Sequence, residues 1–275
     1  MLKLTYVMMR YSCNPMSRFQ DKKFQKRRRD EDPEKVRIRI LNDVFLKTIY
    51  ADILQHQLSF LKSRIAQPCV ILELGSAGGI TKTLRTDIIT CDVRRSTGVD
   101  VILGKDFALP LGESSADLVI AKDVLHHISN PIAHFDEVIR ILKPGASVIY
   151  AEPNWNLLSR IVFKFFHPEP FNPNQLTWEF DSLDPMYSNQ ALPYILFVRD
   201  IELFRTLYPS LIPTIHRSEI NGLSFLLSGG VMNRNFVPSW LLLIIYRIEK
   251  CTPFIRRIFG TLRFIQLTKF EEAGR

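Results

Sequence analysis

The chain alternates between apolar runs of strand length and stretches with the three- and four-residue spacing of an amphipathic helix. Four short apolar runs predict buried strands at residues 69–74, 88–92, 118–121 and 147–151. The first run ends in a small-residue turn, Gly75 to Gly79. A helix is predicted from Ile132 to Leu142, between the third and the fourth run. Strands that alternate with helices predict a parallel sheet that is covered on both faces.

Helical spacing also marks the segment from Val36 to about Ala66, which predicts one amphipathic helix packed against the sheet. After Pro153 the pattern changes. Residues 154–193 are rich in aromatic residues, Pro and Asn, and predict an ordered insertion that lacks long regular elements. The remaining elements are a helix, a strand, an apolar-basic segment and a final strand, at about 199–208, 212–220, 223–259 and 262–267. With a further extended segment that ends at Asp106, they predict a mostly parallel seven-stranded α/β sheet whose last strand is antiparallel.

Composition and charge refine this picture. The 275 residues are 46% hydrophobic and 23% charged, which is typical of a globular protein with a real core. Part of the net charge of +8 comes from the cluster at residues 22–29, which is typical of a solvated arm more than of a binding site. The segment before this cluster lacks an apolar stretch of signal-peptide length, so we expect a cytoplasmic protein.

The division that we predict is a basic, mobile N-terminal arm at 1–34 and a main domain at 35–275. The main domain comprises a core at 68–153, an insertion at 154–198 and an apolar-basic insertion at 223–260. The four cysteines are scattered without a CxxC pair, so neither a disulfide framework nor a zinc site is expected, and we predict no metal.

A strand that ends in a glycine-rich turn and leads into a helix is suited to a nucleotide-like ligand, because small residues let the ligand approach backbone N–H groups. Gly75, Ala77 and Gly79 occupy the small-residue positions. Asp92 ends the second strand, where a carboxylate can accept hydrogen bonds from ribose hydroxyls, and residues 106–110 offer an acid beside an apolar wall. Either aspartate alone is more typical of a helix cap or a turn, but the two together and in this order favour a ligand site.

These motifs, taken in order, resemble those of class I S-adenosylmethionine-dependent methyltransferases with a Rossmann-like fold. The match is to methyltransferase type 11, in its ubiquinone/menaquinone-biosynthesis-like branch. The matching segments are 73–79, Asp92, 106–110, 123–128 and 142–145. Four further segments, at 151–153, 167–171, 191–193 and 227–231, resemble a bacterial subgroup associated with cell-envelope polysaccharide or lipid.

The resemblance implies that S-adenosyl-L-methionine is the cofactor and assigns its contacts. Glu73 and the backbone from Gly75 to Gly79 would hold the methionine part, Asp92 the ribose, and Asp106 with Phe107 the adenine. Ala77 stands where the family usually has its middle glycine. Alanine disfavours positive φ, so we expect it to be tolerated only if this backbone is not left-handed, and we expect reduced affinity for the cofactor.

Methyl transfer from a sulfonium chiefly requires alignment of the nucleophile and removal of its proton. His126 and His127 follow the fourth strand at the edge where ligands bind, and His126 is our candidate catalytic residue. A structural histidine that caps a helix or packs on the cofactor is equally consistent. His167 and Glu169 in the first insertion are second candidates, against the alternative of a loop pinned by prolines.

We expect the acceptor to be a small molecule or a lipid- or polysaccharide-linked group, and no nucleic acid. The apolar-basic insertion is too short to span a bilayer. It suits contact with an anionic membrane surface at the inner face, a cover over a lipid-binding pocket, or packing on the sheet or on another subunit. Two other functions stay open. One is a methyltransferase-like module that binds without catalysis. The other is an NAD-dependent oxidoreductase, whose GxGxxG spacing is absent.

Overall fold

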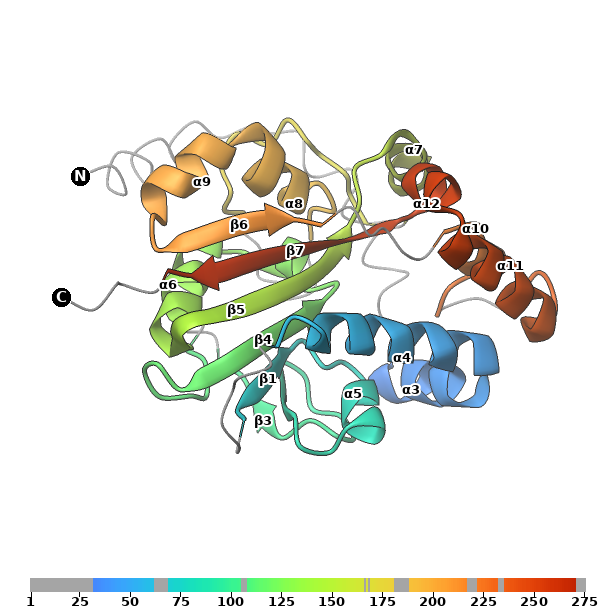
Figure 1. Cartoon of the computed structure of the whole chain (residues 1–275), viewed down its shortest axis with the longest axis horizontal. Helices are drawn as coiled ribbons and strands as arrows, with labels where there is room; N and C mark the ends of the chain where they lie inside the picture. Colours follow the sequence, from blue (N-terminus) through green and yellow to red (C-terminus); the bar gives the residue numbers. More distant parts are fainter. Residues whose placement is uncertain are drawn as a thin grey trace.

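A computed structural model describes residues 32–61, 69–104, 108–165, 167, 169–180, 188–216, 222–231 and 235–270. One seven-stranded sheet forms its centre (Figure 1), in the order β3-β2-β1-β4-β5-β7-β6. The strands are β1 Ile71–Leu74, β2 Ile89–Asp92, β3 Val101–Ile102, β4 Ala116–Lys122, β5 Leu142–Pro153, β6 Leu211–Ile215 and β7 Leu262–Lys269. Strands β1 to β5 pair in parallel, whereas β7 is antiparallel to both β5 and β6. The predicted sheet is therefore confirmed.

The order of the strands determines where a ligand can bind. The chain runs outward from β1 to β3 and then returns to place β4 on the other side of β1. At such a switch point the loops after the two neighbouring strands separate, and a crevice opens at their carboxyl ends. The glycine turn follows β1 and the two histidines follow β4, so both lie at this edge.

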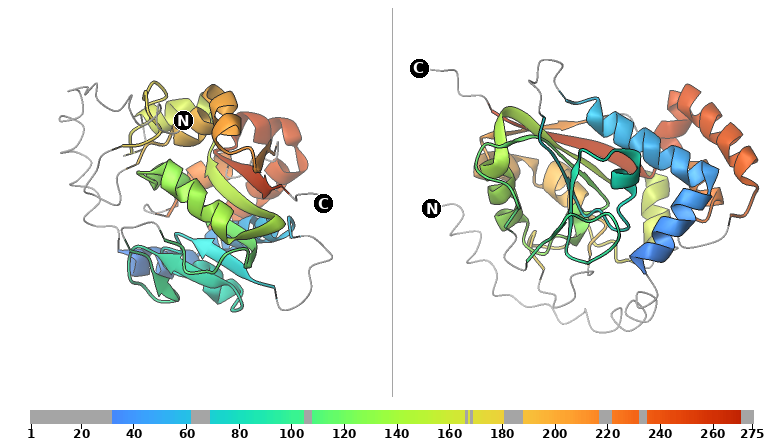
Figure 2. Two further views of the ribbon diagram at one scale, coloured as in Figure 1. Left: turned by 90° about the vertical axis from the view of Figure 1, so that its left-hand side faces the viewer. Right: turned by 90° about the horizontal axis from the view of Figure 1, so that it is seen from below.

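Alternate residues of the central strands face opposite layers of helices (Figure 2). On one face, Leu72 and Val119 pack in the core that contains α6 Pro131–Ile141 and α9 Ile201–Leu207. On the other, Ile71 and Leu118 pack in the core that contains α4 Val44–Leu58 and α11 Ser239–Cys251. The remaining helical segments are α3 Pro33–Asn42, α5 Ile80–Leu84, η3 Leu125–His127, α7 Leu157–Phe165, α8 Leu192–Tyr194, η4 Ile195–Arg199, α10 Leu223–Leu227 and α12 Pro253–Phe259.

The predicted single helix from Val36 to about Ala66 is wrong. Two helices, α3 and α4, replace it, because Asp43 adopts an extended conformation and caps the second. One carboxylate oxygen of Asp43 accepts the backbone N–H groups of Phe45 at 2.9 Å and Leu46 at 3.1 Å. The apolar spacing continues across this break, and for that reason periodicity alone did not reveal it.

The first insertion contains more regular structure than we predicted, since α7 extends over nine residues. The short helix α5, the helix α6 and the strand β7 lie where the sequence places them. The basic cluster at 22–29 and the end of the predicted strand at 217–220 lie outside the described residues.

Candidate active site

The turn after β1 is left-handed at three alternate positions. Gly75, Ala77 and Gly79 have φ values of +67°, +47° and +65°. A Cβ atom on Gly75 would lie 2.3 Å from a methyl group of Val124, and one on Gly79 would lie 2.2 Å from the carbonyl oxygen of Thr97. Both glycines are therefore required by conformation and by space.

We expected alanine to be tolerated at position 77 only if the backbone there is not left-handed, and the structure contradicts this expectation. Its backbone is left-handed, a conformation that costs an L-residue with a Cβ atom about 1–2 kcal/mol. Two hydrogen bonds hold it there: its N–H donates to Asp92 Oδ2 at 2.7 Å, and its carbonyl oxygen accepts from the Ser96 hydroxyl. The fold thus imposes this conformation through neighbouring polar groups.

Asp92 lies at the end of β2 and is buried beneath the turn. Its Oδ1 accepts the N–H of Arg94 at 2.8 Å, and its Oδ2 accepts the N–H of Ala77. Each carboxylate oxygen has two lone pairs, so this arrangement leaves acceptor capacity for a ligand hydroxyl. Contact with a ribose stays a prediction.

Glu73 provides the test of whether the turn fits the implied cofactor. Its Oε1 accepts the Thr81 hydroxyl, whereas its buried Oε2 has no hydrogen-bond partner among the described residues. Burial raises the pKa of the Glu73 carboxyl. A buried acceptor without a partner is unfavourable, and the ammonium group of the methionine part of S-adenosylmethionine is a donor that would satisfy it. The residues present therefore fit this cofactor.

Asp106 and Phe107, the predicted adenine contacts, lie outside the described residues. The same motif continues at Leu109, which is buried and donates its N–H to Glu137 at 2.8 Å. This contact attaches the loop after β3 to α6.

Arg37 is a contact that sequence reasoning missed. Its guanidinium donates to the carbonyl oxygens of Gly78 and Gly79, both at 2.9 Å, so helix α3 braces the glycine turn from outside the motif. A Cβ atom on Gly78 would lie 2.7 Å from both the Arg37 Cβ and the carbonyl oxygen of Pro33. Periodicity placed Arg37 on the polar face of a helix and offered no signal for this role.

The structure brings His126 and Glu169 together, although 43 positions separate them in the sequence. His126 Nδ1 lies 2.6 Å from Oε2 of Glu152, which is fully buried at the end of β5. Oε1 of Glu152 accepts the N–H groups of Val124 and Leu125, at 2.9 and 2.7 Å, so this carboxylate fixes both η3 and the histidine ring. The sequence feature that could have drawn attention to Glu152 is an acidic residue within an otherwise apolar strand.

The opposite edge of His126 faces the first insertion. His126 Nε2 lies 3.5 Å from Oε2 of Glu169, and His127 Nε2 lies 3.9 Å from Oε1 of the same carboxylate. His167 accepts the N–H of Glu169 on Nδ1 at 3.3 Å and packs its ring against Phe163. Of the two second candidates, Glu169 thus reaches the histidine pair directly.

Carboxylates on both sides set the charge of this cluster. Burial alone would lower the pKa of His126, but the attraction of Glu152 and hydrogen bonds to both carboxylates raise it to about 10. Burial would raise the pKa of Glu169, but its hydrogen bond to His126 and the charges of the neighbouring histidines hold it well below its usual range.

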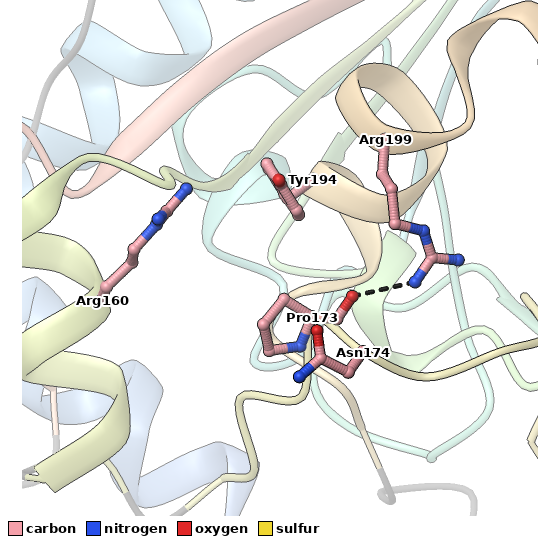
Figure 3. Close-up of a pocket in the computed structure, with 5 residues that line it drawn as sticks. All are labelled: Arg160, Pro173, Asn174, Tyr194 and Arg199. Atoms are coloured by element: carbon pink, nitrogen blue, oxygen red, sulfur yellow. Dashed lines mark hydrogen bonds between the residues drawn. The ribbon is translucent and has the colours of Figure 1, made fainter.

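The first insertion also contributes a cavity of about 250 Å³ (Figure 3). It is lined by Arg160, Pro173, Asn174, Tyr194 and Arg199. Arg199 donates to the carbonyl oxygen of Pro173 at 2.8 Å and pairs with Asp200 at 2.7 Å, while Arg160 lies 5.4 Å from the centre of the Tyr194 ring. Asn189 donates its N–H to the carbonyl of His126 at 2.9 Å, which anchors the insertion to η3.

Comparison with known proteins agrees with the motifs. Residues 72–150 match a family model described as a methyltransferase domain. An uncharacterized 37.1 kDa protein in transposon TN4556 of Streptomyces fradiae is 36% identical over 61 residues, which are 22% of this chain and 18% of that protein. The chain thus matches under a fifth of that relative's length.

Two solved structures are similar in shape. An S-adenosylmethionine-dependent methyltransferase from Archaeoglobus fulgidus has a TM-score of 0.48 and 14% identity, with 81% of this chain and 94% of that chain covered. The YcgJ protein from Bacillus subtilis has a TM-score of 0.44 and 14% identity, with 79% and 99% covered.

The family match includes the glycine turn, Asp92 and η3, and the sheet is mostly parallel with the antiparallel β7 that the resemblance implies. Residues 72–150 of this chain are therefore similar to a methyltransferase domain.

Proposed function

We propose that the whole protein transfers the methyl group of S-adenosylmethionine to a small-molecule or lipid- or polysaccharide-linked acceptor. The observation that supports this most is the left-handed turn after β1, which Asp92 holds from below. Beside it, Glu73 has a buried oxygen without a partner among the described residues. In this proposal Glu73 and the turn bind the methionine part, and Asp92 binds the ribose. Asp106 and Phe107 remain the proposed adenine contacts.

The reaction needs little covalent help from the protein. The acceptor atom forms a bond to the methyl carbon, the carbon–sulfur bond breaks, and its electron pair stays on the sulfur of S-adenosylhomocysteine. A proton leaves the acceptor if its nucleophilic atom carries one. The contribution of the protein is to hold the two reactants in line, which can supply about 7–11 kcal/mol in well-oriented systems.

We place the acceptor beside η3. His126 stays our proposed catalytic residue, with Nε2 directed toward the first insertion and its ring fixed by Glu152. His127, with a side chain 19% exposed, is the more accessible of the two histidines. The acceptor would then enter between η3 and the insertion, above the carboxyl ends of β4 and β5.

Calorimetric titration with S-adenosylhomocysteine tests the cofactor site. We expect binding by the intact protein, and we expect Asp92→Ala to weaken it at least tenfold, because the ribose hydroxyls lose their acceptor. Asp87→Ala is the matched control, since Asp87 is an exposed acid that pairs with Arg85 away from the turn.

Equal affinity in Asp92→Ala and Asp87→Ala would remove Asp92 from the site. If the intact protein bound no S-adenosylhomocysteine, the proposal of methyl transfer by this chain would fail.

The apolar-basic insertion supports a location of the acceptor at an anionic membrane surface. Its helix α11 packs on α4 through Tyr246, whose hydroxyl donates to Asp52 at 2.9 Å. The outer face carries Trp240, Ile244 and Ile248 at four-residue steps, 63%, 45% and 53% exposed. Among the described residues no helix is long and apolar enough to cross a membrane.

This outer face continues into α12, where Phe254 and Ile258 are also exposed. Arg247, Lys250 and Arg257 are exposed on the same two helices. An apolar stripe flanked by cations is the pattern of a helix that lies at the interface of an anionic bilayer. We therefore propose that α11 and α12 contact such a surface and present a lipid-linked acceptor to the domain.

Liposome flotation tests the membrane contact. At low salt we expect the protein to float with vesicles of phosphatidylglycerol and phosphatidylcholine, and less with phosphatidylcholine alone. The double variant Trp240→Ser/Ile248→Ser should remain in the soluble fraction. Leu176→Ser is the control, because Leu176 is an 81% exposed apolar residue outside this insertion.

Equal flotation of the double variant would assign membrane binding to charge alone. Loss of flotation in Leu176→Ser as well would show that any exposed apolar residue suffices, and would argue against α11.

A further inference from the structure

The histidine pair and Glu169 have the arrangement of a metal site. His126, His127 and Glu169 each offer one ligand atom, and these three atoms all lie within 4.8 Å of one another. They come from two segments that the fold brings together, η3 after β4 and the first insertion after β5. We propose that His126 Nε2, His127 Nε2 and the Glu169 carboxylate bind a transition-metal dication.

The spacing between the ligand atoms is the first argument. His126 Nε2 lies 3.5 Å from Oε2 of Glu169, and His127 Nε2 lies 3.9 Å from Oε1 of the same carboxylate. Metal–nitrogen bonds of about 2.0–2.1 Å and metal–oxygen bonds of about 2.0–2.2 Å in a tetrahedron place ligand atoms about 3.3–3.5 Å apart. The three candidate ligand atoms lie within 4.8 Å of one another, so a dication fits between them once the side chains move closer.

The surroundings of the ligands provide the second argument. Histidines that bind a metal usually donate their other ring N–H to a carboxylate, which fixes the tautomer. Glu152, 2.6 Å from His126 Nδ1, has that position and leaves Nε2 as the ligand atom. Ser188 and Gln190 both donate to Oε2 of Glu169, so the orientation of the second ligand is fixed as well, with Oε1 toward His127.

Charge balance supports the same assignment. Glu152 is fully buried and the Glu169 side chain is 11% exposed, so two carboxylates meet in a small volume. Metal binding displaces the proton from His126 Nε2, and a dication bound at the cluster then compensates both negative charges. Two imidazoles and one carboxylate with open positions suit Zn²⁺, Fe²⁺, Co²⁺ or Mn²⁺ better than Mg²⁺ or Ca²⁺, which prefer all-oxygen sites.

The use of this ion rests on the proposed function. Three protein ligands leave at least one open position, and the partly exposed His127 ring marks the side from which a further ligand can approach. An acceptor hydroxyl in that position would lose its proton more readily, because a bound dication lowers the pKa of a coordinated oxygen. The proposal thus specifies an oxygen acceptor.

Metal binding can be measured without an acceptor. The full-length protein, freed of metal with a chelator, is titrated with Zn²⁺ by calorimetry and with Co²⁺ by visible absorption. We expect one ion per chain and a Co²⁺ spectrum of low coordination number. Glu169→Gln and His127→Ala should each weaken binding at least tenfold while retaining the circular dichroism of the intact protein.

Two control variants exclude adventitious binding. His216→Gln removes a histidine that contacts Gln266 of β7, and Cys251→Ser removes an exposed thiol; both should bind Zn²⁺ as the intact protein does. The proposal is overturned if the intact protein shows no saturable site, or if Glu169→Gln and His127→Ala bind as tightly as the controls.

S-adenosylhomocysteine binding, measured on the same samples, separates the two proposals. Cofactor binding without a metal site would overturn only the inference. A metal site without cofactor binding would instead contradict methyl transfer and leave the metal centre in place.

Discussion

At the scale of single residues, the sequence located most of the candidate site but not the residues that hold it in place. The glycine turn, Asp92 and the histidine pair lie at the predicted sheet edge because the ends of parallel strands are easily read from apolar runs. Arg37 and Glu152 could not be assigned roles, since each acts on groups at least 26 positions away. Such contacts depend on how the elements pack, which periodicity does not report.

Ala77 allows a prediction at this scale. Ala77→Gly should raise the free energy of unfolding by about 0.5–1 kcal/mol, because relief of the left-handed strain exceeds the entropic cost of glycine in the unfolded chain. Affinity for S-adenosylhomocysteine should change by less than about twofold, since the strain is already present without the ligand. Denaturant unfolding and calorimetry measure the two quantities.

Ser114→Gly is the control for Ala77→Gly. Ser114 has φ +46° in an exposed turn, so its replacement relieves the same strain away from the site. If only Ser114→Gly stabilised the protein, the left-handed conformation of Ala77 would be contradicted.

At the scale of secondary-structure elements, the predictions were confirmed where apolar runs were continuous and wrong where a polar residue interrupts a helix. Helix α6 shows the first case: Phe135, Val138 and Ile141 have the spacing of one buried face. Asp43 shows the second, because its cap geometry separates α3 from α4 although the apolar spacing continues. Element boundaries depend on such local hydrogen bonds more than on hydrophobic period.

Helix α6 also contains a titratable group that should affect stability. His134 is buried with Nε2 2.7 Å from the Tyr150 hydroxyl, and burial lowers its pKa from 6.5 to about 4. In the unfolded chain His134 becomes protonated below pH 6.5, whereas in the folded protein it stays neutral until about pH 4. His134 should therefore reduce stability as the pH falls through this window, by up to about 3 kcal/mol.

Chemical denaturation of the intact protein and of His134→Gln between pH 7 and 4 measures this contribution. The glutamine can still bond the Tyr150 hydroxyl, and we expect its stability to fall less steeply toward low pH. Parallel curves for the two proteins would show that His134 does not titrate as described.

At the scale of the whole molecule, segments far apart in the sequence assemble around one sheet. Helices α4 and α11, which lie far apart in the sequence, pack side by side, and Lys250 of α11 pairs with Asp52 of α4 at 2.7 Å (Figure 2). The mostly parallel sheet with its antiparallel last strand could be predicted from the resemblance and from the alternation of strands and helices. The docking of α11 on α4 could not be predicted, since an apolar helix offers several faces that suit packing equally well.

This docking has a consequence for any attempt to isolate the family-matched portion. Residues 72–150 contain β2, β3, β4 and most of β1 and β5, yet Leu118, Ile120 and Ile149 pack against helices that lie outside that range. Excised, the fragment would expose the part of its sheet that α4 and α11 cover, and Gly78 would lose the arginine that donates to its carbonyl oxygen. We therefore expect the fragment not to fold by itself. Its glycine turn is braced by a helix that a fragment trimmed to those residues would lack.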